Sequence, residues 1–291
     1  MISVVEAGDE RDELPAFTPI VTEWMRRAFE APTQAQRAAW PVIAEGKNTL
    51  VFSPTGSGKT LAAFLWAIDE LVSLGNQGSR PDQPYVVYIS PLRALANDVE
   101  KNLLAPLREM KDISEEQGIP FPDIRVGVRT GDTLPEERQR MLRRPPQILI
   151  TTPESLYLLL TSSFRDHLRS VRYVIVDEIH HLCGNKRGAH LAISLERLEE
   201  LALRRSARES AAGQPTKGFV RIGLSATQSP VQDIARFLVG CEDDGAERDC
   251  TVVDLGVRRD MDVRVITAVP NLVEAKPEEI WDAIHEQLYD L

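Results

Sequence analysis

Short apolar runs alternate along the chain with longer segments in which apolar residues recur at helical spacing. Short runs that are rich in β-branched residues are typical of strands buried on both faces of a sheet. The expected strands are 49–53, 85–90, 124–130, 147–152, 173–178 and 221–227. The expected helices are 33–45, 59–74, 92–110, 134–143, 153–161 and 188–203. This alternation predicts an α/β fold, with a mostly parallel sheet and helices on both of its faces.

The pattern changes after residue 240. Residues 250–269, CTVVDLGVRRDMDVRVITAV, predict a pair of strands, and residues 277–291, PEEIWDAIHEQLYDL, predict an acidic helix. In parallel sheets of this kind, ligands bind beyond the carboxyl ends of the strands. Polar residues that directly follow the expected strands are therefore the first candidates for a functional site.

Residues 173–184, YVIVDEIHHLCG, contain the most abrupt change of this type. The strand runs into Asp177 and Glu178, and then into His180 and His181. Charged side chains are seldom buried without a partner, so two acids at this position indicate a ligand or a reaction. A solvated acidic turn is the alternative for this dipeptide taken by itself.

Residues 53–60, SPTGSGKT, follow another expected strand and precede an expected helix. Gly56 and Gly58 allow a tight turn in which backbone N–H groups face a phosphate chain, and the helix adds its positive N-terminal end. Lys59 would reach the β- and γ-phosphates, and the Thr60 hydroxyl would ligate Mg²⁺. The residues expected to bind ATP in this loop are Thr55, Gly56, Ser57, Gly58, Lys59 and Thr60. The general pattern begins with glycine where this chain has serine, and a plain glycine-rich turn is the alternative.

The phosphate loop gives the two acids distinct roles. Asp177 would hold the Mg²⁺ through its water shell, and Glu178 would orient and polarise the attacking water. His180 would hydrogen-bond a group that senses the γ-phosphate. The expected catalytic residues are Lys59, Asp177, Glu178 and His180, and the expected metal ligands are Thr60 and Asp177.

The segment HHLCGNKRGAH raises a zinc alternative, with His180, His181, Cys183 and His190 as ligands. Its spacing matches no usual structural zinc pattern, and a second cysteine pair is missing. The chain has three cysteines, and its acidic N-terminus lacks the apolar segment of a signal peptide. These features indicate reduced thiols in a cytoplasmic protein.

The net charge of −10 argues at first against a nucleic-acid partner. The acids, however, are concentrated at the two ends: residues 1–15 hold five acids and one base, and residues 241–291 hold 14 acids and five bases. Residues 16–240 hold 25 acids and 28 bases. This mildly basic middle permits nucleic-acid binding without requiring it. The apolar run 61–68 is far too short to span a bilayer, so no membrane partner is expected.

Five stretches narrow the class of nucleotide-binding protein. In their order and spacing, they resemble the motifs of superfamily 2 helicases: PTQAQ (32–36), SPLRALA (90–96), TTPESL (151–156), DEIH (177–180) and SAT (225–227). The longer segments PTQAQRAAWPVI, SPTGSGKTLAAFL, GDTLPEER and KRGAHLAISLERLE resemble the Lhr (large helicase-related) family of bacteria and archaea. The resemblance covers most of residues 17–240.

The resemblance implies a RecA-like P-loop domain of a translocase that uses ATP and Mg²⁺ and loads on single-stranded DNA. It also implies 3′ to 5′ polarity and unwinding of duplexes, with RNA or RNA–DNA hybrids as further partners. It assigns Gln36 to an adenine-reading motif, and Ser225 and Thr227 to the link between the ATP site and the nucleic-acid path. The residues expected to contact the nucleic-acid backbone are Pro91, Arg93, Arg129, Thr151, Thr152 and Pro153.

A physical argument supports part of this set. Thr151 or Thr152 can cap the helix that Pro153 begins, and free N–H and hydroxyl groups there would bind phosphates without reading bases. Arg93 would add a charge-assisted phosphate contact. Plain helix capping and a solvated arginine are the alternatives. Phe17 would either stack on adenine or anchor the core.

The expected domains are an acidic N-terminal extension (1–16), an ATP-binding RecA-like domain (17–269) and a linker helix (270–291) toward a second RecA-like domain. Because that second domain would supply arginine fingers, the chain alone is expected to bind ATP–Mg²⁺ and to hydrolyse it slowly. Two other classes stay open. A phosphotransferase acting on a small molecule would leave PTQAQ, TTPESL and SAT unexplained. A non-catalytic nucleotide- or nucleic-acid-binding module would not need an intact lysine and acidic pair.

Overall fold

The computed structural model describes residues 1–6, 14–54, 56–79, 82–209, 218–226, 230–255, 267, 269 and 275–289. Within these ranges, the side chains of residues 6, 93–98, 101–102, 205–209 and 288–289 are not described. The chain divides into two compact units, Met1–Gly256 and Val257–Leu291. The first contains the whole sheet, and the helix described in the second is α9 (Pro277–Tyr289). The domain limits expected from the sequence stay predictions.

Eight parallel strands form one sheet in the order β1-β8-β2-β7-β6-β3-β5-β4. The strands are β1 (Ile2–Glu6), β2 (Thr49–Phe52), β3 (Val86–Ile89), β4 (Val126–Arg129), β5 (Ile148–Thr151), β6 (Tyr173–Val176), β7 (Val220–Ser225) and β8 (Cys250–Asp254). The helices of this unit are α1 (Pro19–Ala28), α2 (Gln34–Ala44), α3 (Lys59–Asn76), α4 (Arg93–Gln117), α5 (Pro135–Arg143), α6 (Pro153–Leu160), α7 (Lys186–Glu209) and α8 (Val231–Val239), with 3₁₀ turns η1 (Ser163–Ser170) and η2 (Ile179–His181). Because all the strands are parallel, their carboxyl ends meet at one edge of the sheet.

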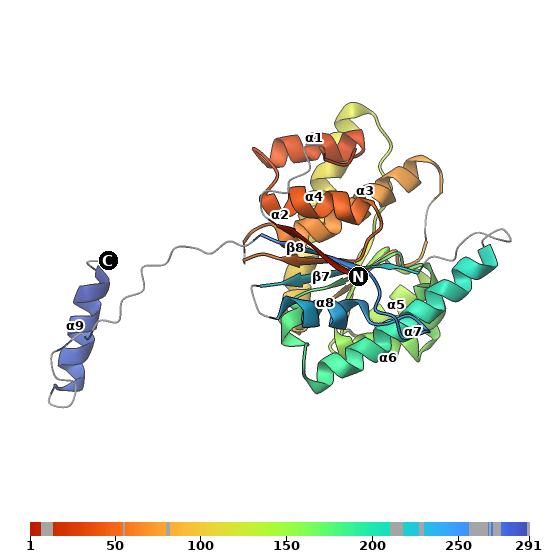
Figure 1. Ribbon diagram of the computed structural model, residues 1–291. Helices are drawn as coiled ribbons and strands as arrows, with labels where there is room; N and C mark the ends of the chain where they lie inside the picture. Colours follow the sequence, from red (N-terminus) through yellow and green to blue (C-terminus); the bar gives the residue numbers. More distant parts are fainter. Residues whose placement is uncertain are drawn as a thin grey trace. The chain divides into compact units, whose positions relative to one another are not determined.

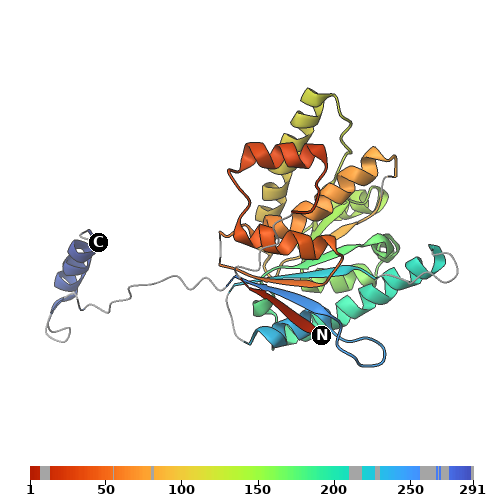
Figure 2. The same cartoon turned by 45° about the horizontal axis from the view of Figure 1, so that its top comes forward.

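The helices form two layers around the sheet. Helices α1 to α4 cover one face, and α5 to α8 cover the other (Figures 1 and 2). Successive residues of each strand point to opposite faces, and every position of β2, β3, β5 and β6 is buried, so these strands are mostly apolar. The predicted α/β architecture with helices on both faces is therefore confirmed.

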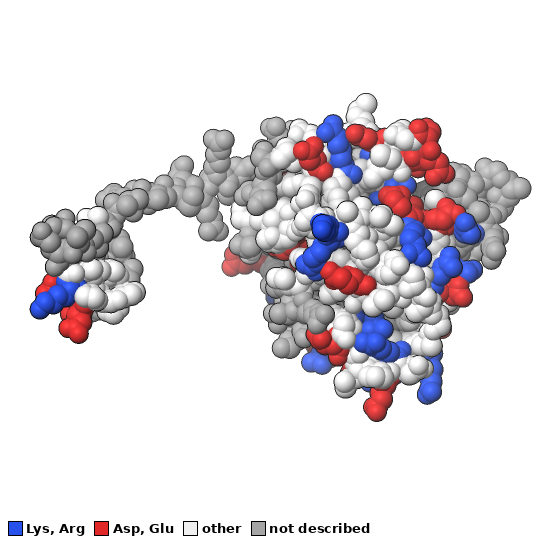
Figure 3. All heavy atoms as spheres, turned by 90° about the horizontal axis from the view of Figure 1, so that it is seen from below, with Lys and Arg blue, Asp and Glu red and all other residues white. Residues whose placement is uncertain are grey.

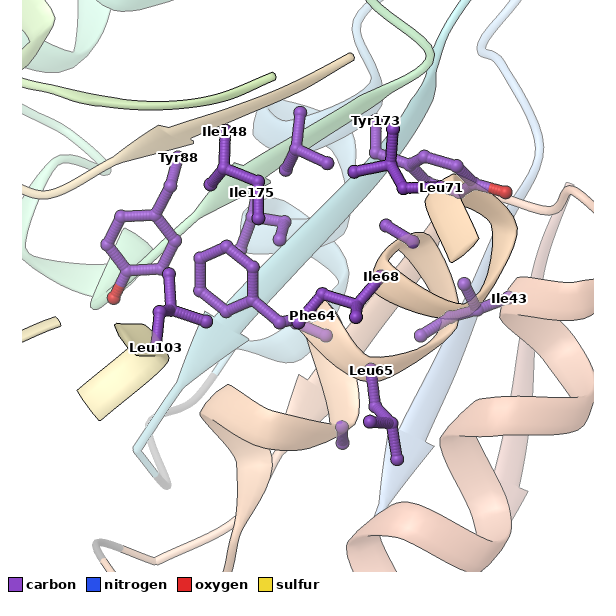
Figure 4. Packing of buried hydrophobic residues seen from close by; sticks show 14 of the residues in the cluster. Ile43, Phe64, Leu65, Ile68, Leu71, Tyr88, Leu103, Ile148, Tyr173 and Ile175 are labelled. Atoms are coloured by element: carbon purple, nitrogen blue, oxygen red, sulfur yellow. The ribbon is translucent and has the colours of Figure 1, made fainter. Parts of the chain in front are cut away.

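Two apolar clusters fill the spaces between the layers. Toward α1 to α4, Phe64 and Ile68 of α3 pack against Tyr88, Ile148 and Ile175 of the sheet (Figure 4). The opposite cluster contains the alternate strand residues together with α6, α7 and α8. These packed layers hold the strand ends in fixed positions, which a site built from several loops requires.

A charged group is also buried beneath the sheet. Arg221 of β7 is only 2% exposed, and it pairs with Glu196 at 3.0 Å and with Glu199 at 3.1 Å, both on α7. Its Nη1 also donates to Leu238 O at 3.1 Å. These bonds compensate for the loss of water around the guanidinium and tie α7 and α8 to the sheet.

The six strands and six helices expected from the pattern all occur, with ends that shift by a few residues. The pattern missed β1, α1 and α8. Residues 2–6, which were assigned to an extension, pair in parallel with β8 and complete the sheet. Of the strand pair expected in 250–269, the first strand is β8, and the second lies outside the described residues.

Basic and acidic side chains are interspersed on the surface formed by the lower helix layer (Figure 3). The described helices include none that is both long and apolar enough to cross a membrane.

Candidate functional site

The loop between β2 and α3 has the backbone conformation that its glycines allow. Gly56 and Gly58 have φ angles of 79° and 80°, in the left-handed region that side chains disfavour. A Cβ at Gly58 would lie 2.8 Å from Gln36 Nε2, so the turn and α2 approach each other closely. Thr55, which was expected to contact ATP, lies outside the described residues.

Several polar groups of this loop are suited to an anion. The N-terminus of α3 receives no side-chain cap, which leaves its first N–H groups directed at the loop. The hydroxyls of Ser53 and Ser57 are buried, and neither has a hydrogen-bond partner within the described structure. Lys59 is 6% exposed, and its Nζ donates to Ser53 O at 3.3 Å. Unsatisfied donors and a buried cation fit a triphosphate chain well.

Gln36 lies beside this loop at the start of α2. Its Oε1 accepts from Thr33 N at 2.9 Å, and Gln36 N donates to Thr33 Oγ1 at 3.3 Å, which forms a capping box. The amide nitrogen is the end that faces Gly58. Its role as an adenine contact stays a prediction. Phe17 packs edge-on against Trp40 at 5.1 Å and Trp66 at 5.7 Å, which places it at the rim of the core.

Asp177 directly follows β6, and it is buried. Its Oδ2 accepts from the Tyr88 hydroxyl, and its Oδ1 accepts from Glu178 N at 3.0 Å. Burial raises the pKa of Asp177, and the Tyr88 hydrogen bond opposes this shift. Burial and the adjacent Asp177 also raise the pKa of Tyr88 far above its usual value, so the phenol stays a donor. Thr60, the other expected Mg²⁺ ligand, is the second residue of α3 and is partly exposed.

Glu178 links the acidic pair to the phosphate loop. Its Oε1 lies 3.6 Å from Lys59 Nζ, and its Oε2 lies 3.4 Å from His180 Nε2. Among the residues that the structure describes, it is the only non-glycine with a positive φ, 45°. A left-handed backbone is costly for such a residue and is often found at functional sites. The structure thus brings together the four residues expected to be catalytic.

His180 connects this cluster to β7. Its Nδ1 lies 3.0 Å from Ser225 Oγ, and Ser225 Oγ donates to Ala226 O at 2.9 Å. Burial and the neighbouring His181 lower the pKa of His180, so its imidazole is neutral at pH 7. This contact joins the DEIH and SAT segments, and the coupling role expected for them stays a prediction. Thr227 lies outside the described residues.

The structure regroups the side chains of the zinc alternative. The ligand atoms of Glu178, His180 and His181 lie within 4.8 Å of one another. Cys183 and His190 are not part of the metal-binding group found in the described part of the chain. The ligand set considered from the sequence is therefore not assembled there.

The residues expected to contact nucleic acid follow the next strands along the same edge. The phosphate loop, Ser225 and Asp177 stand at the ends of β2, β7 and β6, which are neighbours in the sheet. Beyond them, Pro91 follows β3, Thr152 follows β5, and β4 ends at Arg129. One edge of the sheet thus carries both groups of candidates, side by side.

The threonines of the TTPESL segment have structural partners. Thr151 Oγ1 donates to Arg129 O at 2.7 Å. Thr152 is the N-cap of α6, where its side chain accepts from Ser155 N at 3.4 Å, and Pro153 is the first helical residue. Capping by Thr152 is therefore confirmed. Both threonines and Pro153 are buried, and the Ser155 N–H is already bonded by Thr152.

The other residues expected to contact nucleic acid are Pro91, Arg129 and Arg93. Pro91 O accepts from Arg187 Nη2 at 2.9 Å. Arg129 Nη1 donates to Thr130 O at 3.0 Å, and burial with the nearby Arg138 lowers its pKa. Arg93 is the first residue of α4, but its side chain lies outside the described part. Phosphate contacts by these residues stay predictions.

Two further residues escaped the sequence interpretation. Tyr88 lies within the apolar strand β3 and looks like an ordinary core residue, although its hydroxyl bonds Asp177. Arg187 stands 33 residues from its partner Glu154, and the chain between them gives no local signal of the pair. The only signal in the sequence for either contact is that each side chain ends in a polar group that needs a partner.

Comparisons with known proteins show the family of the chain. The family described as DEAD/DEAH box helicase matches residues 33–234. The chain is 50% identical, over 94% of its length, to the ATP-dependent helicase Lhr-Core of Methanothermobacter thermautotrophicus. It is 48% identical, over 96% of its length, to the Lhr helicase/probable uracil glycosylase of Mycolicibacterium smegmatis. It covers 30% and 17% of these two relatives.

One solved structure is similar to this chain in both fold and sequence. The helicase Lhr of Mycobacterium smegmatis, bound to ssDNA and AMP-PNP, aligns with a TM-score of 0.78 and 47% identity. The alignment covers 94% of this chain and 32% of that one. Since the family match extends over more than half of the chain, the chain belongs to the DEAD/DEAH box helicase family.

Proposed function

We propose that this chain is the ATP-binding half of an ATP-dependent helicase or translocase that moves on single-stranded nucleic acid. The observation that carries the proposal is the arrangement along one sheet edge. The phosphate loop follows β2, the acidic pair follows β6, and the His180–Ser225 contact reaches the end of β7. The SPLRALA and TTPESL turns follow the adjoining strands β3 and β5. This arrangement sets a nucleotide site beside a candidate nucleic-acid path.

The residues of the nucleotide site have separate tasks. The backbone of residues 56–58 and Lys59 hold the phosphate chain, and Gln36 contacts the adenine. Thr60 and Asp177 would hold Mg²⁺, which when bound would offset the negative charge on the phosphates. Glu178 orients the attacking water as a general base, and its distances to Lys59 and His180 keep its carboxylate at the loop.

The nucleic-acid side would hold the phosphate backbone without reading bases. The TTPESL turn at the start of α6, together with Arg93 and Arg129, would contact phosphate oxygens. The similarity to a relative described as bound to ssDNA favours single-stranded DNA as the partner. Polarity from 3′ to 5′ and unwinding of DNA or RNA–DNA duplexes are further parts of the proposal, drawn from the resemblance to Lhr proteins. The cytoplasmic location stays a prediction.

A second RecA-like domain would complete the motor. The chain spans a third or less of the three Lhr proteins described above. In this superfamily, arginines of a second domain stabilise the transferring phosphate. Such an arginine contributes a factor of roughly 10³–10⁵ in turnover. We therefore propose that this chain alone binds ATP–Mg²⁺ and hydrolyses it very slowly.

The test measures ATP hydrolysis by the chain across a titration of single-stranded DNA, with nucleotide binding measured on the same sample. The proposal expects nucleotide binding, DNA binding and negligible turnover. Stimulation by a small metabolite instead of DNA would favour a phosphotransferase. Rapid DNA-dependent turnover by the monomer would contradict the need for a second domain, and absence of nucleotide binding would contradict the proposal as a whole.

A further inference from the structure

Arg187, the second residue of α7, bridges two segments that are proposed to face nucleic acid. Its Nε donates to Glu154 Oε1 at 2.6 Å, and its Nη2 donates to Glu154 Oε2 at 3.3 Å. The same Nη2 donates to Pro91 O at 2.9 Å. One guanidinium thus holds the first turn of α6 and the turn after β3 in a single arrangement.

The segment that carries Arg187 is tied closely to the catalytic acids. Asn185 Nδ2 donates to His181 O at 2.6 Å, and Asn185 Oδ1 accepts from Gly188 N at 3.0 Å. A Cβ at Gly188 would lie 1.8 Å from Leu182 O, so the start of α7 fits against the turn after η2 because this residue is glycine. The path from Glu178 to Arg187 is therefore short and constrained.

We propose that Arg187 is a positioning residue that sets the nucleic-acid path according to the conformation of the catalytic loop. A shift of the Asp177–Glu178 segment would move Arg187, and with it both the α6 N-terminus and the Pro91 turn. This connection runs beside the His180–Ser225 contact and reaches the opposite side of the site. The inference rests on the proposed function, since it names what links the two halves of that site.

The alternative is that Arg187 binds phosphate directly, because its side chain is 46% exposed. The two roles differ in what lysine can replace. A lysine keeps the charge but cannot span Glu154 and Pro91 O with a planar fork of donors. A direct phosphate contact would therefore survive in Arg187→Lys, whereas the bridge would be lost.

Glu154→Gln separates the two roles by the sign of its effect. Electrostatics alone predicts that removing a negative charge beside a polyanion path tightens DNA binding. The bridge predicts the opposite, because a neutral amide holds Arg187 less firmly. Weaker DNA binding by Glu154→Gln would therefore support the positioning role of Arg187.

The experiment measures fluorescence anisotropy of labelled single-stranded oligothymidylate with the chain at low salt, with and without AMP-PNP and Mg²⁺. The variants are Arg187→Lys, Arg187→Met and Glu154→Gln. The matched control is Arg204→Met, which removes an exposed arginine–glutamate pair of 2.5 Å on the same helix. We expect the three bridge variants to weaken DNA binding by roughly three- to tenfold and the control to change it less than about twofold. Affinity for the nucleotide analogue should stay as in the wild type.

Each other outcome has a definite meaning. Wild-type affinity in Arg187→Lys with a loss only in Arg187→Met would assign a phosphate contact and overturn the bridge. Equal or tighter binding by Glu154→Gln would also overturn it. If the wild-type chain binds the oligothymidylate and all the variants bind equally well, this inference alone fails. If the wild-type chain binds no DNA, the proposed function fails, and the inference fails with it.

Discussion

Tyr88→Phe removes one hydroxyl from a fully buried strand and tests how Asp177 is held. The ring would stay in place, since it stacks on Phe64 with centroids 5.0 Å apart. Asp177 would keep its bond from Glu178 N at 3.0 Å but would lose the donor to its other oxygen. The variant therefore changes the hydrogen bonding of one carboxylate with almost no change in packing.

The size of the effect follows from the burial of both groups. A hydrogen bond to a charged acceptor contributes about 1.5–3 kcal/mol, and one pKa unit corresponds to about 1.4 kcal/mol. Burial already raises the pKa of Asp177, and the Tyr88 bond lowers it, so removal of the bond raises this pKa further. The carboxylate needed for Mg²⁺ exists above this pKa and is lost as pH falls through it. The loss in the variant therefore begins at higher pH.

The assay is the Mg²⁺ dependence of fluorescent ATP-analogue binding, measured across pH in the wild type and in Tyr88→Phe. We expect the acidic limb of Mg²⁺-dependent binding to move to higher pH in the variant, in the direction that the pKa of Asp177 moves. Tyr85→Phe is the matched control, because it removes a tyrosine–carboxylate bond of 2.8 Å to Glu70 at the other end of β3. That control should leave the Mg²⁺ and pH dependence unchanged.

Two results would refute this reasoning. An unchanged acidic limb in Tyr88→Phe would mean that Tyr88 does not set the ionisation of Asp177. An equal displacement in Tyr85→Phe would mean that loss of any tyrosine hydroxyl from this strand disturbs the site. In the first case, the bond from Glu178 N would be the one that holds the Asp177 carboxylate.

Three further predictions follow from the described geometry. In a protein that supplies the second RecA-like domain, Glu178→Gln should keep ATP affinity and lower turnover by about 10²–10⁴-fold, whereas undiminished steady-state turnover would leave Glu178 without a role as base. Gly58→Ala should weaken ATP binding by about tenfold or more in a fluorescence titration. A left-handed backbone disfavours a Cβ, and the Cβ at this position would lie 2.8 Å from Gln36 Nε2. Wild-type affinity would show that the loop can readjust. Arg221→Met should lower the free energy of unfolding in urea by about 3–5 kcal/mol, since it leaves Glu199 buried without its partner, and a loss below about 1 kcal/mol would mean that water reaches this pair.

The sequence could predict elements whose signal is local. The strands around Val51, Val87 and Ile175 were evident because both faces of each strand are buried, so their residues are mostly apolar. The phosphate loop was evident because its glycines serve a local turn. The strand β1 was missed because the polar stretch that follows it resembles a solvated extension, and its partner β8 is more than 240 residues away.

The contacts that escaped prediction are those between residues distant along the chain. Tyr88 lies 89 residues before Asp177, and Arg187 lies 96 residues after Pro91. Hydrophobic periodicity reports which face of an element is buried, but not which polar atom that face will meet. The carboxyl ends of strands could be expected to share one edge, whereas the particular donor for each acid depended on the order of strands in the sheet.

That order has a consequence for how the sheet is assembled. β8 lies between β2 and β1, so Thr251 stands opposite both Thr49 and Ser3. During synthesis at about 5–20 residues per second, residues 2–6 would wait roughly 12–50 s before their described strand partner has been made. Contacts this distant form slowly because a long loop must close first. Residues 2–6 therefore stay without this partner while most of the unit is translated, and β1 is protected only once β8 has been made.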